Sequence, residues 1–151
     1  NSYVGLGAAY VEKGDLVKAE AQYLKALQMM PDYAEVYNAL GVLYLNQGKV
    51  EEAGDAFDKN LQLDPENINA LVNRASIMAY RGFFVEAIAD FHGALEVGGR
   101  NPDILFNLAI AYAKNGDTDK AILALEEVVR LDPQDKQAST SLEQLRLLKK
   151  K

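Results

Sequence analysis

The chain has 151 residues, a formal charge of −6 and a pI near 4.8. That acidic balance argues against a nucleic-acid partner, because affinity for the phosphate backbone comes from clustered Lys and Arg. The absence of cysteine excludes disulfides and cysteine ligands to metals, and no apolar stretch approaches the roughly 20 residues that span a bilayer. Direct membrane insertion is therefore not expected. The compartment stays open, with the cytoplasm favoured and the periplasm as the alternative.

The chain repeats itself at a spacing of 34 residues, which predicts four units at 1–33, 34–67, 68–101 and 102–134. Four columns carry the repeat. They are the glycines Gly14, Gly48, Gly82 and Gly116; the alanines Ala19, Ala53, Ala87 and Ala121; the small residues Gly7, Gly41, Ala75 and Ala109; and the large residues Tyr23, Phe57, Phe91 and Leu125. Because the first residue is Asn1 rather than Met, we expect a processed form or a segment of a longer protein.

Each unit is predicted to form two short helices. Apolar residues recur at spacings of three and four, as in Leu40, Leu43 and Tyr44, which is the periodicity of a helix and not of a strand. A small residue in the first helix lets the second helix approach closely. Glycine after that first helix can adopt the left-handed conformation that ends a helix without a Cβ clash.

After the fourth unit, residues 135–151 place apolar side chains at helical spacing. They are Ala138, Leu142, Leu145 and Leu148. We expect a terminal helix that covers the apolar face of the last unit, which stacked repeats require for solubility. The closing lysines 149–151 are read as a solvated helix end, with a basic interaction tail as the alternative.

The second unit carries the signature most clearly. Its run Ala39-Leu40-Gly41-Val42-Leu43-Tyr44, followed by Gly48, Ala53, Phe57 and Asp64-Pro65, resembles the tetratricopeptide repeat. The resemblance covers residues 1–134. It implies an all-α, right-handed superhelical solenoid of four helical hairpins, closed here by the terminal helix.

Three residues depart from the repeat pattern. Asn60 stands where the other units have Ala or Val, and we expect it to loosen or polarise a contact between repeats. Arg74 stands where Leu40 and Leu108 are apolar, and its stem is expected along the edge of a groove. Gly99 takes the place of the terminal proline in the third unit, which predicts a more flexible junction.

The residues needed for catalysis are scarce. His92 is the single histidine, and it lies one residue away from the predicted buried stripe, where a surface role is expected. Too few ligands are present for a metal site built on His or Cys. We therefore expect no enzyme activity and no cofactor.

The resemblance implies a concave face lined by the first helix of each unit. Positions two and three before the small residue, and one, four and five after it, are expected to face inward. The predicted groove residues are Asn38, Val42, Leu45, Val72, Asn73, Ser76, Tyr80, Phe106, Asn107 and Ile110. Five of them have no evident apolar partner within the array, namely Val42, Leu45, Val72, Phe106 and Ile110. The groove is therefore predicted to bind an extended or helical segment of a partner protein, as a scaffold or adaptor does.

Asn73 and Asn107 occupy equivalent positions 34 residues apart. An Asn side chain both donates and accepts hydrogen bonds, so such a ladder can bind a peptide backbone without regard to sequence. At these two positions the chain resembles the arrays of O-linked N-acetylglucosamine transferases, although Asn is also common in the repeat consensus. Two alternatives stay open, a substrate-recruiting array of a larger enzyme such as a glycosyltransferase, and weak self-association through convex or terminal faces. A clamp for an acidic chaperone tail is not expected, because Lys and Arg donors are missing and Asp103 would repel a carboxylate.

Overall fold

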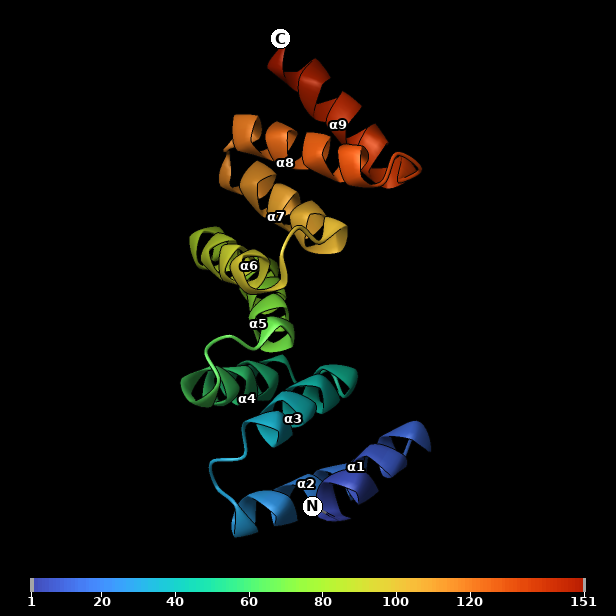
Figure 1. The fold of residues 1–151 in the computed structure, drawn as a ribbon, viewed down its shortest axis with the longest axis vertical. Helices are drawn as coiled ribbons and strands as arrows, with labels where there is room; N and C mark the ends of the chain where they lie inside the picture. The colour runs from blue at the N-terminus through green and yellow to red at the C-terminus, as the bar shows by residue number, and fades with distance from the viewer. Residues whose placement is uncertain (1, 151) are drawn as a thin grey trace. The chain divides into compact units, whose positions relative to one another are not determined.

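The computed structural model describes residues 2–150, and every regular element within that range is an α-helix (Figure 1). The predicted all-α class is confirmed. The helices are α1 (Ser2–Glu12), α2 (Leu16–Met29), α3 (Ala34–Asn46), α4 (Val50–Leu63), α5 (Ile68–Tyr80), α6 (Phe84–Gly98), α7 (Pro102–Asn115), α8 (Thr118–Leu131) and α9 (Lys136–Lys149). The chain divides into two compact units, Asn1–Asn73 and Arg74–Lys151, and the boundary between them lies inside α5.

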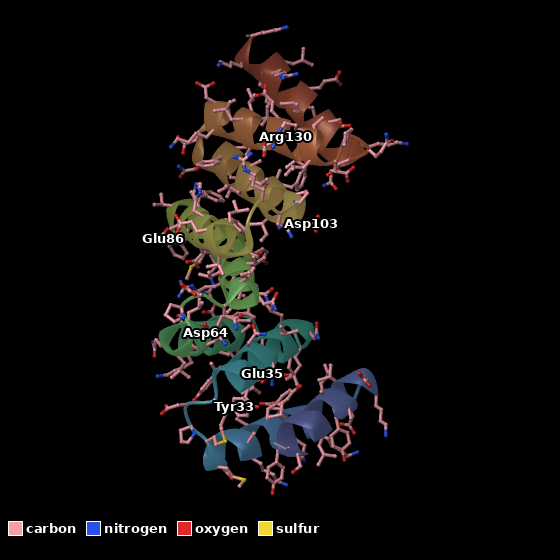
Figure 2. All side chains as sticks on the ribbon, in the orientation of Figure 1. Tyr33, Glu35, Asp64, Glu86, Asp103 and Arg130 are labelled. Carbon is pink, nitrogen blue, oxygen red and sulfur yellow. The ribbon has the colours of Figure 1, made fainter. Side chains whose placement is uncertain are left out.

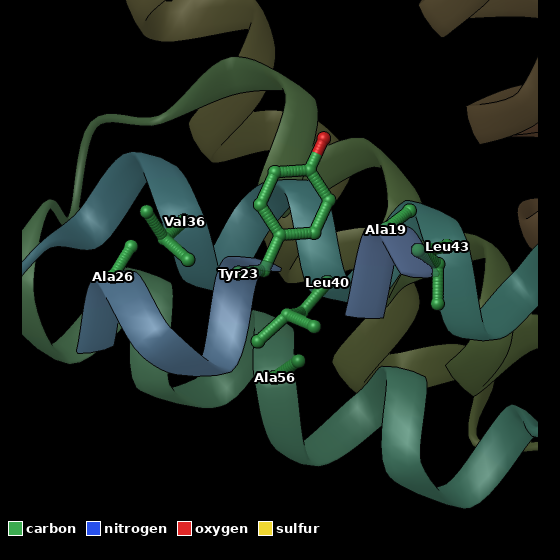
Figure 3. Close-up of a cluster of buried hydrophobic side chains, with 7 residues drawn as sticks. All are labelled: Ala19, Tyr23, Ala26, Val36, Leu40, Leu43 and Ala56. Atoms are coloured by element: carbon green, nitrogen blue, oxygen red, sulfur yellow. The ribbon is translucent and has the colours of Figure 1, made fainter. Parts of the chain in front are cut away.

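In the first unit, helices adjacent in the chain pack against one another. Helix α2 packs against α1 and α3, and α3 packs against α4. Their shared core contains Ala19, Tyr23, Ala26, Val36, Leu40, Leu43 and Ala56 (Figure 3). The repeated alanine column explains the close packing, because Ala19 is fully buried and its methyl group lets a neighbouring helix approach.

The small-residue column has a specific partner in the second helix of each of the first two hairpins. A Cβ added at Gly7 would lie 2.5 Å from the ring of Tyr23, and one added at Gly41 would lie 2.6 Å from the ring of Phe57. Both distances are shorter than atoms can tolerate, so glycine is required for the ring to lie against the helix backbone. The expected close approach of the two helices in a hairpin is therefore confirmed.

The predicted helix ends are also confirmed. Gly14, Gly48, Gly82 and Gly116 all have positive φ, between 74° and 89°. Side-chain caps begin several helices; for example, Asp135 Oδ1 accepts a hydrogen bond of 2.9 Å from the backbone N–H of Ala138. Charges also match the helix dipoles in Figure 2, where Glu35, Glu86 and Asp103 lie in first turns and Arg130 lies in the last turn of α8.

In the second unit, α7 packs against α6 and α8, and α9 packs against α8. Ala138 and Leu142 of α9 join a core cluster with Leu105, Ala109, Leu125 and Val128. The expected covering of the last hairpin by the terminal helix is therefore confirmed. Leu148, which was expected on the same face, is instead 63% exposed.

Two ion pairs also hold α9 to α8. Arg146 contacts Glu126 at 2.7 Å, and Lys149 contacts Asp119 at 2.6 Å. The Lys149 side chain is 58% exposed, as expected of a solvated helix end, although its ammonium group pairs with Asp119. The last lysine covered by that prediction lies outside the described residues. Because both pairs are largely exposed, each contributes at most about 1 kcal/mol.

Asn60 is completely buried, and the hydrogen bond that its side chain donates lies within its own hairpin, so its effect on a contact between repeats stays a prediction. Its Nδ2 donates a 2.7 Å hydrogen bond to the carbonyl oxygen of Ala34, at the start of α3 in the same hairpin. Its Oδ1 is buried and accepts no hydrogen bond from the described residues. The polar contact therefore lies within the second hairpin.

Arg74 forms a contact that the repeat pattern did not predict. Its guanidinium forms a bidentate ion pair with Asp90 of α6, with Nε–Oδ2 and Nη2–Oδ1 distances of 2.7 and 2.8 Å. The side chain is one quarter exposed, and that of Asp90 is less exposed still. The head group is therefore held between the helices of the third hairpin. The position of its stem along a groove edge stays a prediction.

Candidate functional site

A hollow of about 460 Å³ lies on the second unit between α5 and α7. We call it the inner hollow. Its lining residues are Ser76, Ala79, Tyr80, Gly82, Phe84, Phe91, Asn107, Ile110, Ala111 and Lys114. Four of the predicted groove residues therefore come together here, namely Ser76, Tyr80, Asn107 and Ile110.

Helical spacing explains why these side chains share one hollow. Ser76 and Tyr80 lie one turn apart on α5, and Asn107, Ile110 and Lys114 follow one face of α7 at spacings of three and four. The turn at Gly82, where φ is +86°, sends the chain from α5 into α6 beside the hollow. The hollow is thus built on helices rather than on a loop.

The lining combines exposed apolar surface with a few polar groups. Tyr80 is 84% exposed and Ile110 is 39% exposed, although both are large and apolar. Phe91, which is almost fully buried, contributes to the floor. Lys114 is the charged residue in the lining, and no carboxylate joins it among the residues that line the hollow. Such a surface suits a ligand with an apolar side chain and a backbone or carboxylate oxygen nearby.

The remaining predicted groove residues lie outside the inner hollow. Asn38, Val42 and Leu45 belong to α3, and Val72 and Asn73 belong to the first two turns of α5, all in the first unit. Val42 is exposed, whereas the other four are half-buried. Asn38 Oδ1 is buried and accepts no hydrogen bond from the residues described. The Asn73–Asn107 ladder stays a prediction, because its two members belong to different units.

Phe106 corrects one part of the groove prediction. It was expected to lack an apolar partner, but it is half-buried and packs against the core cluster that contains Leu105, Ala109 and Leu142. Part of its ring is thus committed to the core of the second unit.

Several lining residues are not among the ten predicted groove residues. Lys114 lies five positions after Ala109, so the inward-facing spacing does select it. Phe84 and Phe91 lie on α6, the second helix of its hairpin, and the first-helix rule could not find them. Their signal in the sequence was only the helix periodicity that also marks core residues.

A second hollow of about 500 Å³ lies between α6, α7 and α8, and we call it the outer hollow. Its lining residues are His92, Leu95, Arg100, Leu105, Leu108, Tyr112, Lys120, Leu123, Ala124 and Glu127. His92 is exposed, and its Nε2 lies 2.6 Å from the hydroxyl of Tyr112. Lys120 Nζ lies 5.4 Å from the centre of the same ring. Among residues 2–150 no group of His, Asp and Glu is arranged to hold a metal ion.

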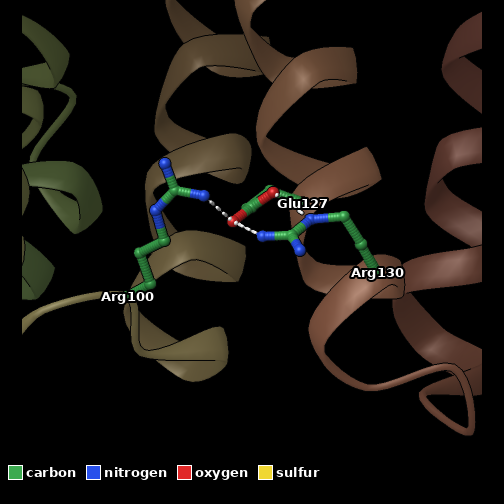
Figure 4. Close-up of polar contacts among 3 residues, drawn as sticks. All are labelled: Arg100, Glu127 and Arg130. Atoms are coloured by element: carbon green, nitrogen blue, oxygen red, sulfur yellow. Dashed lines mark hydrogen bonds and ion pairs between the residues drawn. The ribbon is translucent and has the colours of Figure 1, made fainter.

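One carboxylate at the edge of the outer hollow binds two arginines (Figure 4). Glu127 Oε1 lies 2.6 Å from Arg100 and 2.6 Å from Arg130, and Glu127 Oε2 accepts a further bond from Arg130 Nε at 2.8 Å. The hydrogen bonds from Arg130, followed by those from Arg100, lower the pKa of Glu127 from 4.5 to about 2. Arg100 thereby ties the junction after α6 to α8, although the predicted flexibility of that junction is not tested.

We expect the Glu127 carboxyl to titrate near pH 2 in a ¹³C NMR titration. Because its pKa is lower in the folded state than the ordinary 4.5, its stabilising contribution is complete above pH 4.5 and is lost as the pH falls toward 2. Arg130→Gln should raise this midpoint more than Arg100→Gln does. Equal shifts in the two variants, or a midpoint near 4.5 in the unmodified chain, would contradict the assignment.

No helix in the described range is long and apolar enough to cross a bilayer. Family models described as TPR repeat and tetratricopeptide repeat match residues 7–48, 34–67 and 81–145. No curated protein sequence matches the chain.

Solved structures share the fold. The crystal structure of MamA is 26% identical, with a TM-score of 0.89 over 95% of this chain and 84% of that one. MamA from Desulfovibrio magneticus RS-1 is 19% identical, with a TM-score of 0.90 over 98% and 84% of the two chains, and it shows the fold alone. The first TPR of Spaghetti (RPAP3), bound to the HSP90 peptide SRMEEVD, is 25% identical, with a TM-score of 0.73 over 78% and 94%.

Proposed function

Because the chain belongs to the tetratricopeptide repeat family, we propose that it is a non-catalytic interaction module whose inner hollow binds a peptide segment of a partner protein. The observation that carries this proposal is the exposure of Tyr80 beside Asn107, Ile110 and Lys114 in one hollow. A large aromatic side chain with 84% of its surface exposed, next to polar groups, is typical of a binding site rather than of a core.

The lining indicates how a peptide would bind. Tyr80 and Ile110 would contact an apolar side chain of the peptide and remove it from water. Asn107 has a carboxamide that can pair with both the N–H and the C=O of an extended backbone. Lys114 would favour a carboxylate close to that side chain. The RPAP3 repeat domain, which is 25% identical, offers a precedent because it is bound to a peptide in its solved structure.

The proposal is tested with a displayed library of random linear peptides, selected against the 151-residue chain. Selected peptides are then titrated against the chain and against the double variant Tyr80→Ala/Asn107→Ala by isothermal calorimetry. We expect affinity to fall at least about tenfold in the double variant, because truncation of an exposed anchor residue costs on the order of 1–3 kcal/mol.

Leu123→Ala is the matched control. Leu123 is also a large exposed side chain on the second unit, but it lines the outer hollow. Its removal should leave peptide affinity unchanged. If the double variant binds the selected peptides as tightly as the unmodified chain, or if Leu123→Ala alone weakens binding, the inner hollow is not the site.

A further inference from the structure

The outer hollow has an apolar floor and a cationic rim. Leu95, Leu105 and Leu108 lie in the floor, and the exposed side chains of Arg100 and Lys120 lie at the rim. Glu127 is the carboxylate in the lining, and Arg100 and Arg130 already neutralise it. Nothing in the peptide-binding proposal uses this surface.

The 34-residue repeat identifies the equivalent surface on the first unit, 68 positions earlier. There the charges are reversed. Asp32 occupies the position equivalent to Arg100, Glu52 the position equivalent to Lys120, and Lys59 the position equivalent to Glu127. The apolar positions are kept: Leu27, Leu40 and Tyr44 are equivalent to Leu95, Leu108 and Tyr112. The first unit therefore carries, on the same helical positions, the complement of the charge pattern on the second.

The net charge is divided in the same way. Residues 1–73 contain 11 acidic and 5 basic side chains, whereas residues 74–151 contain 11 of each. The whole formal charge of −6 thus lies on the first unit. A chain with this asymmetry attracts a second copy when the first unit of one approaches the cationic rim on the second unit of the other.

An exposed apolar side chain accompanies the acidic positions. Leu24 occupies the position equivalent to His92, and it is 43% exposed on α2. Asp32 and Glu52 are also exposed. A leucine side chain is small compared with the 500 Å³ of the outer hollow, and burial there would remove its surface from water.

We propose that the outer hollow is a docking site for the first unit of a second copy of this chain. Asp32 and Glu52 of one copy face Arg100 and Lys120 of the other, and Leu24 enters the apolar floor. The contact joins two different surfaces, so it is heterologous. It is independent of peptide binding in the inner hollow.

Light scattering of the 151-residue chain at rising concentration tests the proposal. Because a heterologous contact can add one copy after another, we expect the mean mass in low salt to rise above 16.6 kDa with concentration and not to stop at the dimer. The mass should return to the monomer value in about 1 M NaCl, where charges are screened beyond about 3 Å. A mass that stays at the monomer value in low salt up to millimolar protein overturns the proposal. The proposal is overturned by that result even if the monomeric chain binds an acidic peptide of another protein.

Charge reversal distinguishes this contact from other modes of association. Lys120→Glu and Glu52→Lys should each weaken association at least about tenfold, because like charges then face each other. The variant with both changes, and an equimolar mixture of the two single variants, should associate again, since each restores opposite charges across the contact. Failure of both to recover association overturns the proposal.

Lys114→Glu provides the control, because this exposed lysine lines the inner hollow and not the outer one. Its association should match that of the unmodified chain. Loss of association in this variant would place the contact at the inner hollow and overturn the proposal. Far-UV circular dichroism of each variant verifies that the exposed substitutions leave the helices folded.

Discussion

Replacing Phe57 with alanine is expected to lower the free energy of unfolding by about 3–5 kcal/mol, toward the upper end of that range. Phe57 is fully buried in the first unit. Its ring lies against the backbone of α3 at Gly41, where even a Cβ would lie 2.6 Å away. Because Gly41 has no side chain that could move into the space, the cavity left by the ring cannot close from that side.

Two further variants make the comparison specific. Phe57→Leu should cost less than about 2 kcal/mol, since a leucine fills most of the space and Leu125 occupies the equivalent position in the fourth hairpin. Phe83→Ala removes the same ring from a half-exposed position at the start of α6, and it should cost less than about 1 kcal/mol. Urea unfolding followed by circular dichroism measures all three. If Phe57→Ala and Phe83→Ala are equally stable, the ring against Gly41 does not hold the hairpin together.

The repeat made the helices predictable. Paired columns, such as those of Gly41 and Phe57, show which two helices pack together, because the residue in one helix must be small where the ring of the other lies against it. The turn glycines likewise report a backbone conformation that does not depend on distant residues. Element type and the turn positions could therefore be read from the spacing alone.

The site was only partly predictable, because the spacing indicates a face of a helix and not what packs on it. Ser76, Tyr80, Asn107 and Ile110 were placed in one groove from their spacing, and they do line one hollow. Phe106 satisfies the same spacing, yet its ring packs against the core cluster that contains Leu105 and Ala109. The spacing alone does not distinguish a side chain that faces the groove from one that packs against the core.

Polar residues in apolar columns were harder to interpret. The partner of Arg74 is Asp90, 16 positions away in the next helix. The two replace the apolar pair that the second hairpin carries at the same positions, Leu40 and Ala56, which share a core cluster in Figure 3. The fourth hairpin has Leu108 and Ala124 there. When two positions of one hairpin depart together from the repeat pattern, the departure indicates that the two residues are in contact. Either residue considered alone would be interpreted as a variable surface position.

This exchange predicts opposite effects for single and double substitution. Asp90→Ala should lower the free energy of unfolding by about 1–3 kcal/mol, because it leaves the half-buried guanidinium of Arg74 without its carboxylate. The double variant Arg74→Leu/Asp90→Ala installs the pair found in the second and fourth hairpins. We expect it to be at least as stable as the unmodified chain, since a well-packed apolar pair often equals or exceeds a desolvated ion pair.

A double-mutant cycle with Arg74→Leu, Asp90→Ala and the combined variant measures the coupling by urea unfolding. Repeating it in about 1 M NaCl separates charge from packing, because a shielded bidentate pair should keep most of its coupling energy whereas an exposed one would lose it. Additive losses in the two single variants would contradict a direct interaction. If the double variant is instead less stable than Asp90→Ala, the helix spacing in the third hairpin is adapted to the arginine. A leucine then does not fit at position 74, although it fits at the equivalent positions of the second and fourth hairpins.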